Sequence, residues 1–240
     1  MKKFRFKFKL GFFLLCLFFT VLFGFLGVWQ LHRYHFKKEL LVSYQQRAHA
    51  APKPFSAATQ QAFQNVSING RYLNQFTVLM QNQFYHDRLG FEVFTPLQIP
   101  GQNKLLLVDR GWVAAGKNQT PPLLESPQGE QQIKGYIKLL NEYQYILGEN
   151  LLNPKASPLI VQKIDVSELS RVTGQAYWPF ILRLDPSQLH GFTRDWTVSA
   201  VLPERHMGYA VQWFALALMM IIAFSCFCFE KIEENSDGKK

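Results

Sequence analysis

Long stretches without charged residues fix the broad class of this 240-residue chain. No Asp, Glu, Lys or Arg occurs in residues 10–31 or in residues 207–229. At about 1.5 Å per helical residue, each stretch is long enough to cross the hydrocarbon core of a bilayer, which is about 30 Å thick. We therefore predict two transmembrane helices, because two such runs would be a rare coincidence among the core helices of a soluble protein.

Cysteine is absent from the sequence between the two spans. The three cysteines are Cys16, Cys226 and Cys228, which all lie within the predicted spans. A disulfide framework and a cysteine-ligated metal site are therefore excluded for the intervening domain.

The sequence also lacks the common signatures of enzymes. It has no G-x-G-x-x-G after a predicted strand, no Walker A loop, no H-E-x-x-H and no G-x-S-x-G. No two of its six histidines are spaced four apart, as a metal pair on a helix would be. We therefore predict that the protein is not an enzyme.

Basic residues directly before the first span set its orientation. Residues 1–9 contain five Lys or Arg and no acid. Positive charge stays on the cytoplasmic side, so residues 1–9 and, after two crossings, residues 230–240 should be cytoplasmic, with residues 32–206 as an extracytoplasmic β-rich domain. The same cluster supplies more than half of the net charge of +9. That charge therefore indicates contact with anionic membrane lipid and not with nucleic acid.

The first apolar run also bears on the location of the protein. It is longer than a signal-peptide core, which usually has about 7–15 residues, and no A-x-A-like cleavage site follows it. We therefore expect an uncleaved anchor. Because no long presequence rich in Arg and Ser precedes the run, we expect a multi-pass protein of the bacterial cell inner membrane, with its main domain in the periplasm.

Between the spans, helical spacing is expected to continue to about Arg47 and to end before Pro52. Two short helices are predicted, from Ser56 to Phe63 and over Asp165–Arg171. Short β-like runs separated by turn residues make up most of the remainder: Val66–Tyr72, Phe76–Met80, Phe91–Ile99, Lys104–Val113, Gln131–Leu140, Trp178–Leu184 and Trp196–Val201. We predict a mainly antiparallel, barrel-like β domain with short helices, flanked by the two transmembrane α-helices.

Aromatic and polar side chains gather where the two spans meet the outer membrane surface. The candidate site residues are Trp29, Gln30 and Arg33 on the first helix and His206, Tyr209 and Trp213 on the second. One interpretation is an aromatic belt with a snorkelling arginine. The other is a pocket for a large, flat, amphipathic cofactor with an acidic edge, in which His206 could ligate iron and Arg33 or Arg205 could pair with propionates.

The segment Arg110-Gly111-Trp112 ends the best candidate for a central strand. Gly111 would allow a tight turn and Trp112 would fill the core, so we predict structural support and not ligand contact. Asp109 and Arg110, adjacent on a strand, should point to opposite faces.

Four motifs, in order along the chain, resemble those of the SURF1/Shy1 family. They are Gly27-x-Trp29-Gln30-x-x-Arg33, Gly90–Leu97 (GFEVFTPL), Val108–Val113 (VDRGWV) and His206-x-x-Tyr209-Ala210-x-x-Trp213-Phe214. Departures from the family pattern are Phe36 before Lys37 in place of Trp, Asp109 in place of Asn, Ala114 in place of Pro, and the charged Arg205 before the histidine.

The resemblance implies an assembly factor for haem-copper cytochrome c oxidase. It implies binding of haem a and help with its insertion into oxidase subunit I. The family's membrane-proximal histidine falls on His206, and the first motif falls on Gly27, Trp29, Gln30 and Arg33. The implied partners are oxidase subunit I, haem A synthase and membrane lipid. The alternative is a membrane scaffold that docks an oxidase subunit without binding haem.

Overall fold

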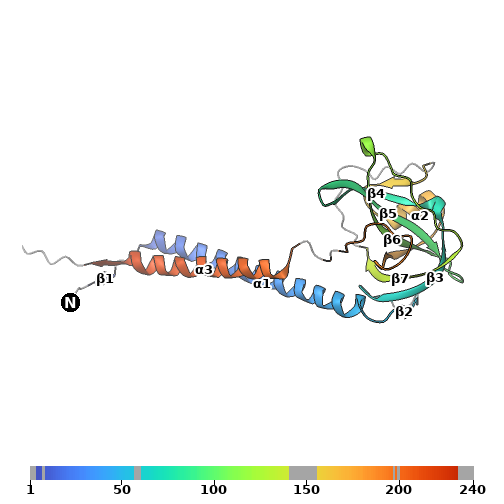
Figure 1. Cartoon of the computed structure of the whole chain (residues 1–240). Coiled ribbons are helices and arrows are strands. Elements are labelled where there is room, and N and C mark those ends of the chain that lie inside the picture. The colour runs from blue at the N-terminus through green and yellow to red at the C-terminus, as the bar shows by residue number, and fades with distance from the viewer. Residues whose placement is uncertain are drawn as a thin grey trace, which may run out of the picture. The chain divides into compact units, whose positions relative to one another are not determined.

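A computed structural model describes residues 4–6, 9–56, 61–140, 156–196, 198 and 201–231. The chain divides into two compact units. The helical unit comprises Met1–Val42 and Val198–Lys240, and the β unit comprises Ser43–Thr197. Figure 1 shows the elements of both units.

Two long helices, α1 (Leu10–Ala48) and α3 (Pro203–Cys228), dominate the helical unit. Both are long and apolar enough to cross a membrane. Helix α1 ends at Ala48, close to the predicted end, because Pro52 disfavours a helical residue before it. Helix α3 begins with Pro203, which is suited to the first helical turn, where its missing N–H leaves no bond unmade. Strand β1 (Phe4–Phe6) pairs antiparallel with β10 (Phe229–Lys231).

Helices α1 and α3 run antiparallel and side by side (Figure 1). Small and aromatic residues line the seam between them. Phe12 near the start of α1 stacks on Phe224 near the end of α3, with ring centroids 6.4 Å apart. Gly27 is buried, and a Cβ added there would lie 2.7 Å from the ring of Phe214. Small residues allow helix backbones to approach closely in a membrane, so Gly27 sets the separation of this pair.

The β unit is built on one eight-stranded sheet in the order β2-β3-β7-β9-β6-β5-β4-β8. An additional pairing of β3 with β5 closes five of these strands into a barrel. Most pairs are antiparallel, which confirms the predicted fold class. The strands are β2 (Lys53–Pro54), β3 (Asn65–Tyr72), β4 (Val78–Tyr85), β5 (Arg88–Gln98), β6 (Leu105–Ala114), β7 (Glu130–Leu139), β8 (Leu159–Val161) and β9 (Tyr177–Leu184).

Short helices complete the β unit. Helix α2 (Val166–Thr173) is capped by Asp165, whose carboxylate accepts from the backbone N–H groups of Ser167 and Glu168, and it ends at Gly174 in the left-handed conformation. This confirms the prediction over Asp165–Arg171. Single 3-10 turns lie at η1 (Asn74–Phe76) and η2 (Lys117–Gln119).

Two of the predicted elements differ from the structure. The predicted helix from Ser56 to Phe63 lies partly outside the described residues, and its described residues are not helical. The predicted strand Trp196–Val201 also lies partly outside them, and Trp196, Val198 and Val201 are not in a strand. Trp196 instead donates from its indole N–H to the backbone oxygen of Leu184, at 2.9 Å.

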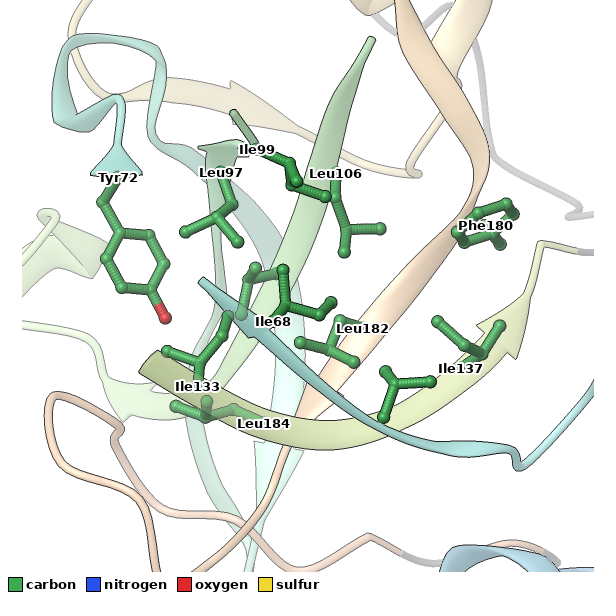
Figure 2. Packing of buried hydrophobic residues seen from close by; sticks show 12 residues of the cluster. Ile68, Tyr72, Leu97, Ile99, Leu106, Ile133, Ile137, Phe180, Leu182 and Leu184 are labelled. Atoms are coloured by element: carbon green, nitrogen blue, oxygen red, sulfur yellow. The ribbon is translucent and has the colours of Figure 1, made fainter. Parts of the chain in front are cut away.

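The barrel interior is filled by branched aliphatic side chains from strands that are distant in sequence (Figure 2). Ile68 of β3, Leu97 of β5, Leu106 of β6 and Leu182 of β9 are at most 2% exposed and lie in one cluster. Burial of these side chains, at about 1.5–3 kcal/mol each, holds the strands in register.

Candidate functional site

A polar contact between the two long helices joins Gln30 of α1 to His206 of α3. His206 Nδ1 lies 2.8 Å from Gln30 Oε1, and both side chains are half-buried. Gln30 follows Gly27 by three residues and so lies on the same face of α1. His206 precedes the buried Ala210 by four residues and so lies on the corresponding face of α3. The seam itself therefore brings the imidazole and the amide together.

Trp213 lies farther along the same seam. Its ring stacks on Phe23 of α1, with centroids 5.6 Å apart and an interplanar angle of 28°. Because Trp213 is seven residues after His206, it occupies the same face of α3 about two turns away. An imidazole and an indole thus share the face that α3 turns toward α1.

Trp29 and Arg33 form a second group on the outward flank of α1. The Arg33 guanidinium lies over the Trp29 ring, with Cζ 5.7 Å from its centroid. Trp29 is 45% exposed, and it lies about 100° around the helix from Gln30. Tyr209 of α3 is likewise 50% exposed. The structure thus joins Gln30 to His206 and Arg33 to Trp29, and leaves Trp29 and Tyr209 open to their surroundings.

In the β unit, a bulge between β5 and β6 directs Asp109 and Arg110 to different surroundings. Val93 pairs with Gly111 and Phe94 with Asp109, so Arg110 is the extra residue. Gly111 has a φ of 105°, which favours glycine. Asp109 forms an ion pair with Arg183. Arg110 instead donates hydrogen bonds to Thr95 and to the loops that contain Glu125 and His190. This confirms the predicted divergence of the two side chains.

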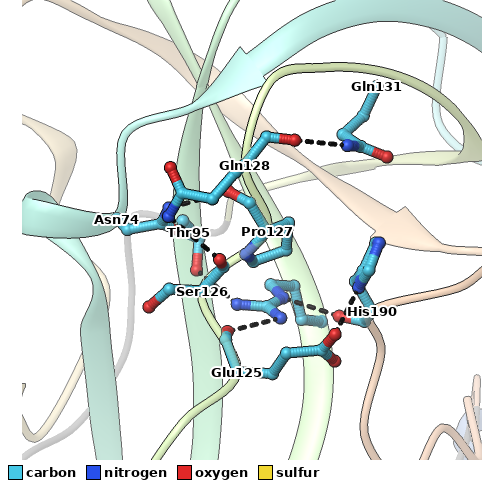
Figure 3. Close-up of polar contacts among 9 residues, drawn as sticks. Asn74, Thr95, Glu125, Ser126, Pro127, Gln128, Gln131 and His190 are labelled. Atoms are coloured by element: carbon cyan, nitrogen blue, oxygen red, sulfur yellow. Dashed lines mark hydrogen bonds and ion pairs between the residues drawn. The ribbon is translucent and has the colours of Figure 1, made fainter.

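Arg110 ties two loops to this bulge through hydrogen bonds to His190 and Glu125, two of the residues that Figure 3 labels. Its side chain is 1% exposed and donates to the backbone oxygens of His190 (2.8 Å) and Glu125 (3.0 Å) and to Thr95 Oγ1 (3.3 Å). The rings of Tyr72 and Phe192 lie 5.5 and 4.9 Å from its Cζ. Burial lowers the pKa of Arg110 from its usual high value. The buried guanidinium therefore acts as a structural clamp.

Trp112 has a comparable structural task. Its indole N–H donates to the backbone oxygen of Gln83 at 3.0 Å. A Cβ at Gly90 would lie 2.5 Å from the Trp112 ring, so glycine makes room for the indole. Both observations agree with the predicted supporting role of the Arg110-Gly111-Trp112 segment.

A carboxyl pair, the half-buried Glu92 of β5 and the buried Asp109 of β6, was not anticipated from the sequence. Burial and the adjacent Asp109 raise the pKa of Glu92 to about 9, and burial raises the pKa of Asp109. Arg183 Nε lies 3.4 Å from Asp109 Oδ2, and its Nη1 donates to the Tyr136 hydroxyl at 3.3 Å. The signal available in the sequence was an acidic residue directly after the apolar run that ends at Val108.

Metal ligation by protein side chains alone finds no support in the described part of the chain, where no group of three His, Cys, Asp or Glu residues could hold an ion. The donor set at the seam is different. It offers one imidazole with aromatic and apolar neighbours, which suits a metal already held by a macrocycle.

Comparison with known proteins identifies a family to which the chain is similar. The family model described as the SURF1 family matches residues 17–218. A SURF1-like protein of Dictyostelium discoideum is 31% identical over 272 residues, covering 91% of this chain and 96% of the relative. A SURF1-like protein of Drosophila melanogaster is 25% identical and covers 87% of this chain and 74% of the relative. One from Rickettsia bellii is 23% identical and covers 83% of each.

Proposed function

The chain belongs to the SURF1 family, known for assembly factors of cytochrome c oxidase, and from this premise we propose that it shelters haem a and assists its insertion into oxidase subunit I. The single observation that carries the proposal is the Gln30–His206 pair in the seam of two membrane-spanning helices. Haem a is largely apolar and poorly soluble in water, so its transfer is favoured within the membrane and between protein surfaces.

The residues of the helical unit fit a haem. His206 would hold the haem iron through an imidazole nitrogen, and Trp213 would offer a flat apolar wall. Arg33 and Arg205 are exposed and offer positive charge to propionates. When bound, the haem would supply an iron that can take a nitrogen ligand from the protein. A single protein ligand and few further polar contacts would hold it without making release slow.

The membrane arrangement belongs to the same proposal. Helices α1 and α3 cross the bacterial inner membrane, both chain ends lie in the cytoplasm, and the β unit lies in the periplasm. In this setting oxidase subunit I receives the haem and haem A synthase supplies it. The protein acts by binding and release, without catalytic turnover.

A scaffold that docks an oxidase subunit without haem is the second candidate. The observation that favours it is a pair of exposed leucines, Leu123 and Leu189, at 103% and 80% exposure. In the sequence, Leu123 lies two residues before Glu125 and Leu189 lies directly before His190. His190 Nδ1 and Glu125 Oε1 are 2.6 Å apart. Exposed apolar side chains beside a polar pair are typical of a surface that meets another protein.

Purification from cells that make haem a separates the two candidates. We expect the wild-type chain to carry haem a, visible in its absorption spectrum, and His206→Ala to carry roughly a tenth of it or less. The matched control is His35→Ala, because His35 is an exposed histidine of the same helical unit. Equal haem in His206→Ala and the wild type would remove the ligand assignment. A wild-type chain without haem would favour the scaffold.

A further inference from the structure

The Gln30–His206 hydrogen bond is a polar contact in a seam that is otherwise largely small or aromatic. Its two atoms, Nδ1 and Oε1, lie 2.8 Å apart, which is an ordinary hydrogen-bond length. Hydrogen bonds between membrane helices contribute only about 1 kcal/mol, so stability alone is a weak reason for this pair. A more specific effect of the bond is that it determines which nitrogen of the His206 ring carries the proton.

An amide oxygen accepts hydrogen bonds and cannot donate them, so the partner of Oε1 must carry the proton. In this geometry His206 Nδ1 is therefore the N–H of the ring. A neutral imidazole has one N–H only, which leaves the lone pair on Nε2. Iron binds the nitrogen that has the lone pair. The same bond also fixes the rotation of the ring about its side-chain torsions.

We propose that Gln30 is a positioning residue, which holds His206 as the Nδ1–H tautomer and so makes Nε2 the nitrogen that ligates haem iron. Gln30 itself then does not contact the haem. The ligand role rests on the proposed function, whereas the tautomer assignment rests only on the contact between the helices. Ligating histidines commonly donate their other ring N–H to such a partner, whose loss weakens metal binding by about 10–100-fold.

The helix seam explains why this amide can do the task. Gly27, one turn before Gln30, lets Phe214 lie against the backbone of α1. Ala210, one turn after His206, is 1% exposed. Because Gly27 and Ala210 are small, the two helix backbones approach closely enough for the Gln30 amide to reach the His206 ring.

The tautomer is measured directly by nitrogen NMR. The full chain, with ¹⁵N-labelled histidine, is placed in lipid nanodiscs without haem at mildly alkaline pH, and the His206 signals are identified by their loss in His206→Ala. We expect the protonated nitrogen to be Nδ1 in the wild type and a mixture of tautomers in Gln30→Leu. The matched control is Gln212→Leu, which removes an exposed amide from α3 and should leave the tautomer unchanged.

Haem titration of the same samples tests the ligand role. We expect the Kd for haem a to rise about tenfold in Gln30→Leu. Gln30→Glu, which retains an acceptor oxygen, should restore the Nδ1–H tautomer and the affinity. A wild-type His206 protonated at Nε2, or a tautomer unaffected by Gln30→Leu, would overturn the positioning role. Tautomer change without loss of affinity would overturn its relevance to haem. Absence of haem binding by the wild type would instead reject the proposed function, with the tautomer result still standing.

Discussion

At the scale of single residues, the Glu92–Asp109 pair is the least expected feature of the β unit. The two carboxyl groups lie close together. The positive charges of Arg183 and Lys138 lower the pKa of both groups, against the larger effect of burial. Because burial raises the pKa of Glu92 to about 9, the pair retains a proton at neutral pH. A protonated carboxyl can donate to its ionised neighbour, which makes this close contact stable.

Glu92→Gln should be more stable than the wild type, and the difference in stability should grow as pH rises. The pKa of Glu92 is about 9 in the folded state, against a usual 4.5. The folded state therefore binds more protons between these values, and the stability of the wild type falls as pH rises through this window. Glutamine keeps a donor for Asp109 and does not ionise. We expect Glu92→Gln to gain roughly 2 kcal/mol at pH 8, or about 5 °C in Tm, and little at pH 5.

Thermal unfolding of the full chain in nanodiscs at several pH values measures this difference. Glu130→Gln is the matched control, since Glu130 is an exposed glutamate on β7. An equal response of both variants to pH would show that Glu92 does not retain its proton in the folded state.

Arg110→Lys should destabilise the β unit although it keeps the positive charge. Lysine cannot reach the His190, Glu125 and Thr95 oxygens together, because it lacks the planar fork of donors. We expect a loss of roughly 2–3 kcal/mol, or about 8 °C in Tm. The exposed Arg71, changed to Lys, provides the comparison. Similar Tm values for the two variants would mean that the buried contacts of Arg110 add little.

At the scale of elements, the close approach of α1 and α3 depends on one glycine. Gly27→Leu would place a branched side chain where the Phe214 ring lies, whereas Gly24 has no atom within 4 Å of an added Cβ. We therefore expect Gly27→Leu to separate the helices and Gly24→Leu to leave them in place. Spin labels at Val28 and Val211, both exposed, report the distance in a variant without native cysteines. Unchanged distances in Gly27→Leu would contradict this role.

Elements governed by local sequence were predictable. The uncharged runs predicted both long helices, and the local sequence over Asp165–Arg171 predicted α2. Pairings between strands that are distant in sequence were not predictable. Strand β8 has only three residues. The β3–β5 pairing that closes the barrel joins Tyr72 to Leu97, although strand β4 lies between them in the sequence. Such pairs depend on tertiary packing and register, which no local propensity determines.

The candidate site shows the same division. Helical spacing correctly grouped Trp29 with Arg33, because both lie on one helix. It did not determine which face of α1 meets α3. That face is set by the packing of Gly27 against Phe214, which brings Gln30 and not Trp29 to His206. The Glu92–Asp109 pair was missed because it depends on the register of β5 against β6.

At the scale of the whole molecule, the account requires the β unit to lie outside the cytoplasm. A cysteine at Leu123, which is fully exposed, should react with a membrane-impermeant maleimide in intact bacterial cells when native cysteines are replaced. A cysteine at Lys240 should react only after lysis. Labelling of the Lys240 position alone in intact cells would reverse the proposed orientation.

Ligation of haem a by His206 can be tested by chemical rescue with imidazole. His206→Gly is purified from cells that make haem a, and its absorption spectrum is recorded before and after imidazole is added. The account predicts little bound haem in the variant alone and a spectrum like that of the wild type once imidazole occupies the vacated volume. A wild-type spectrum in His206→Gly without added imidazole would contradict it.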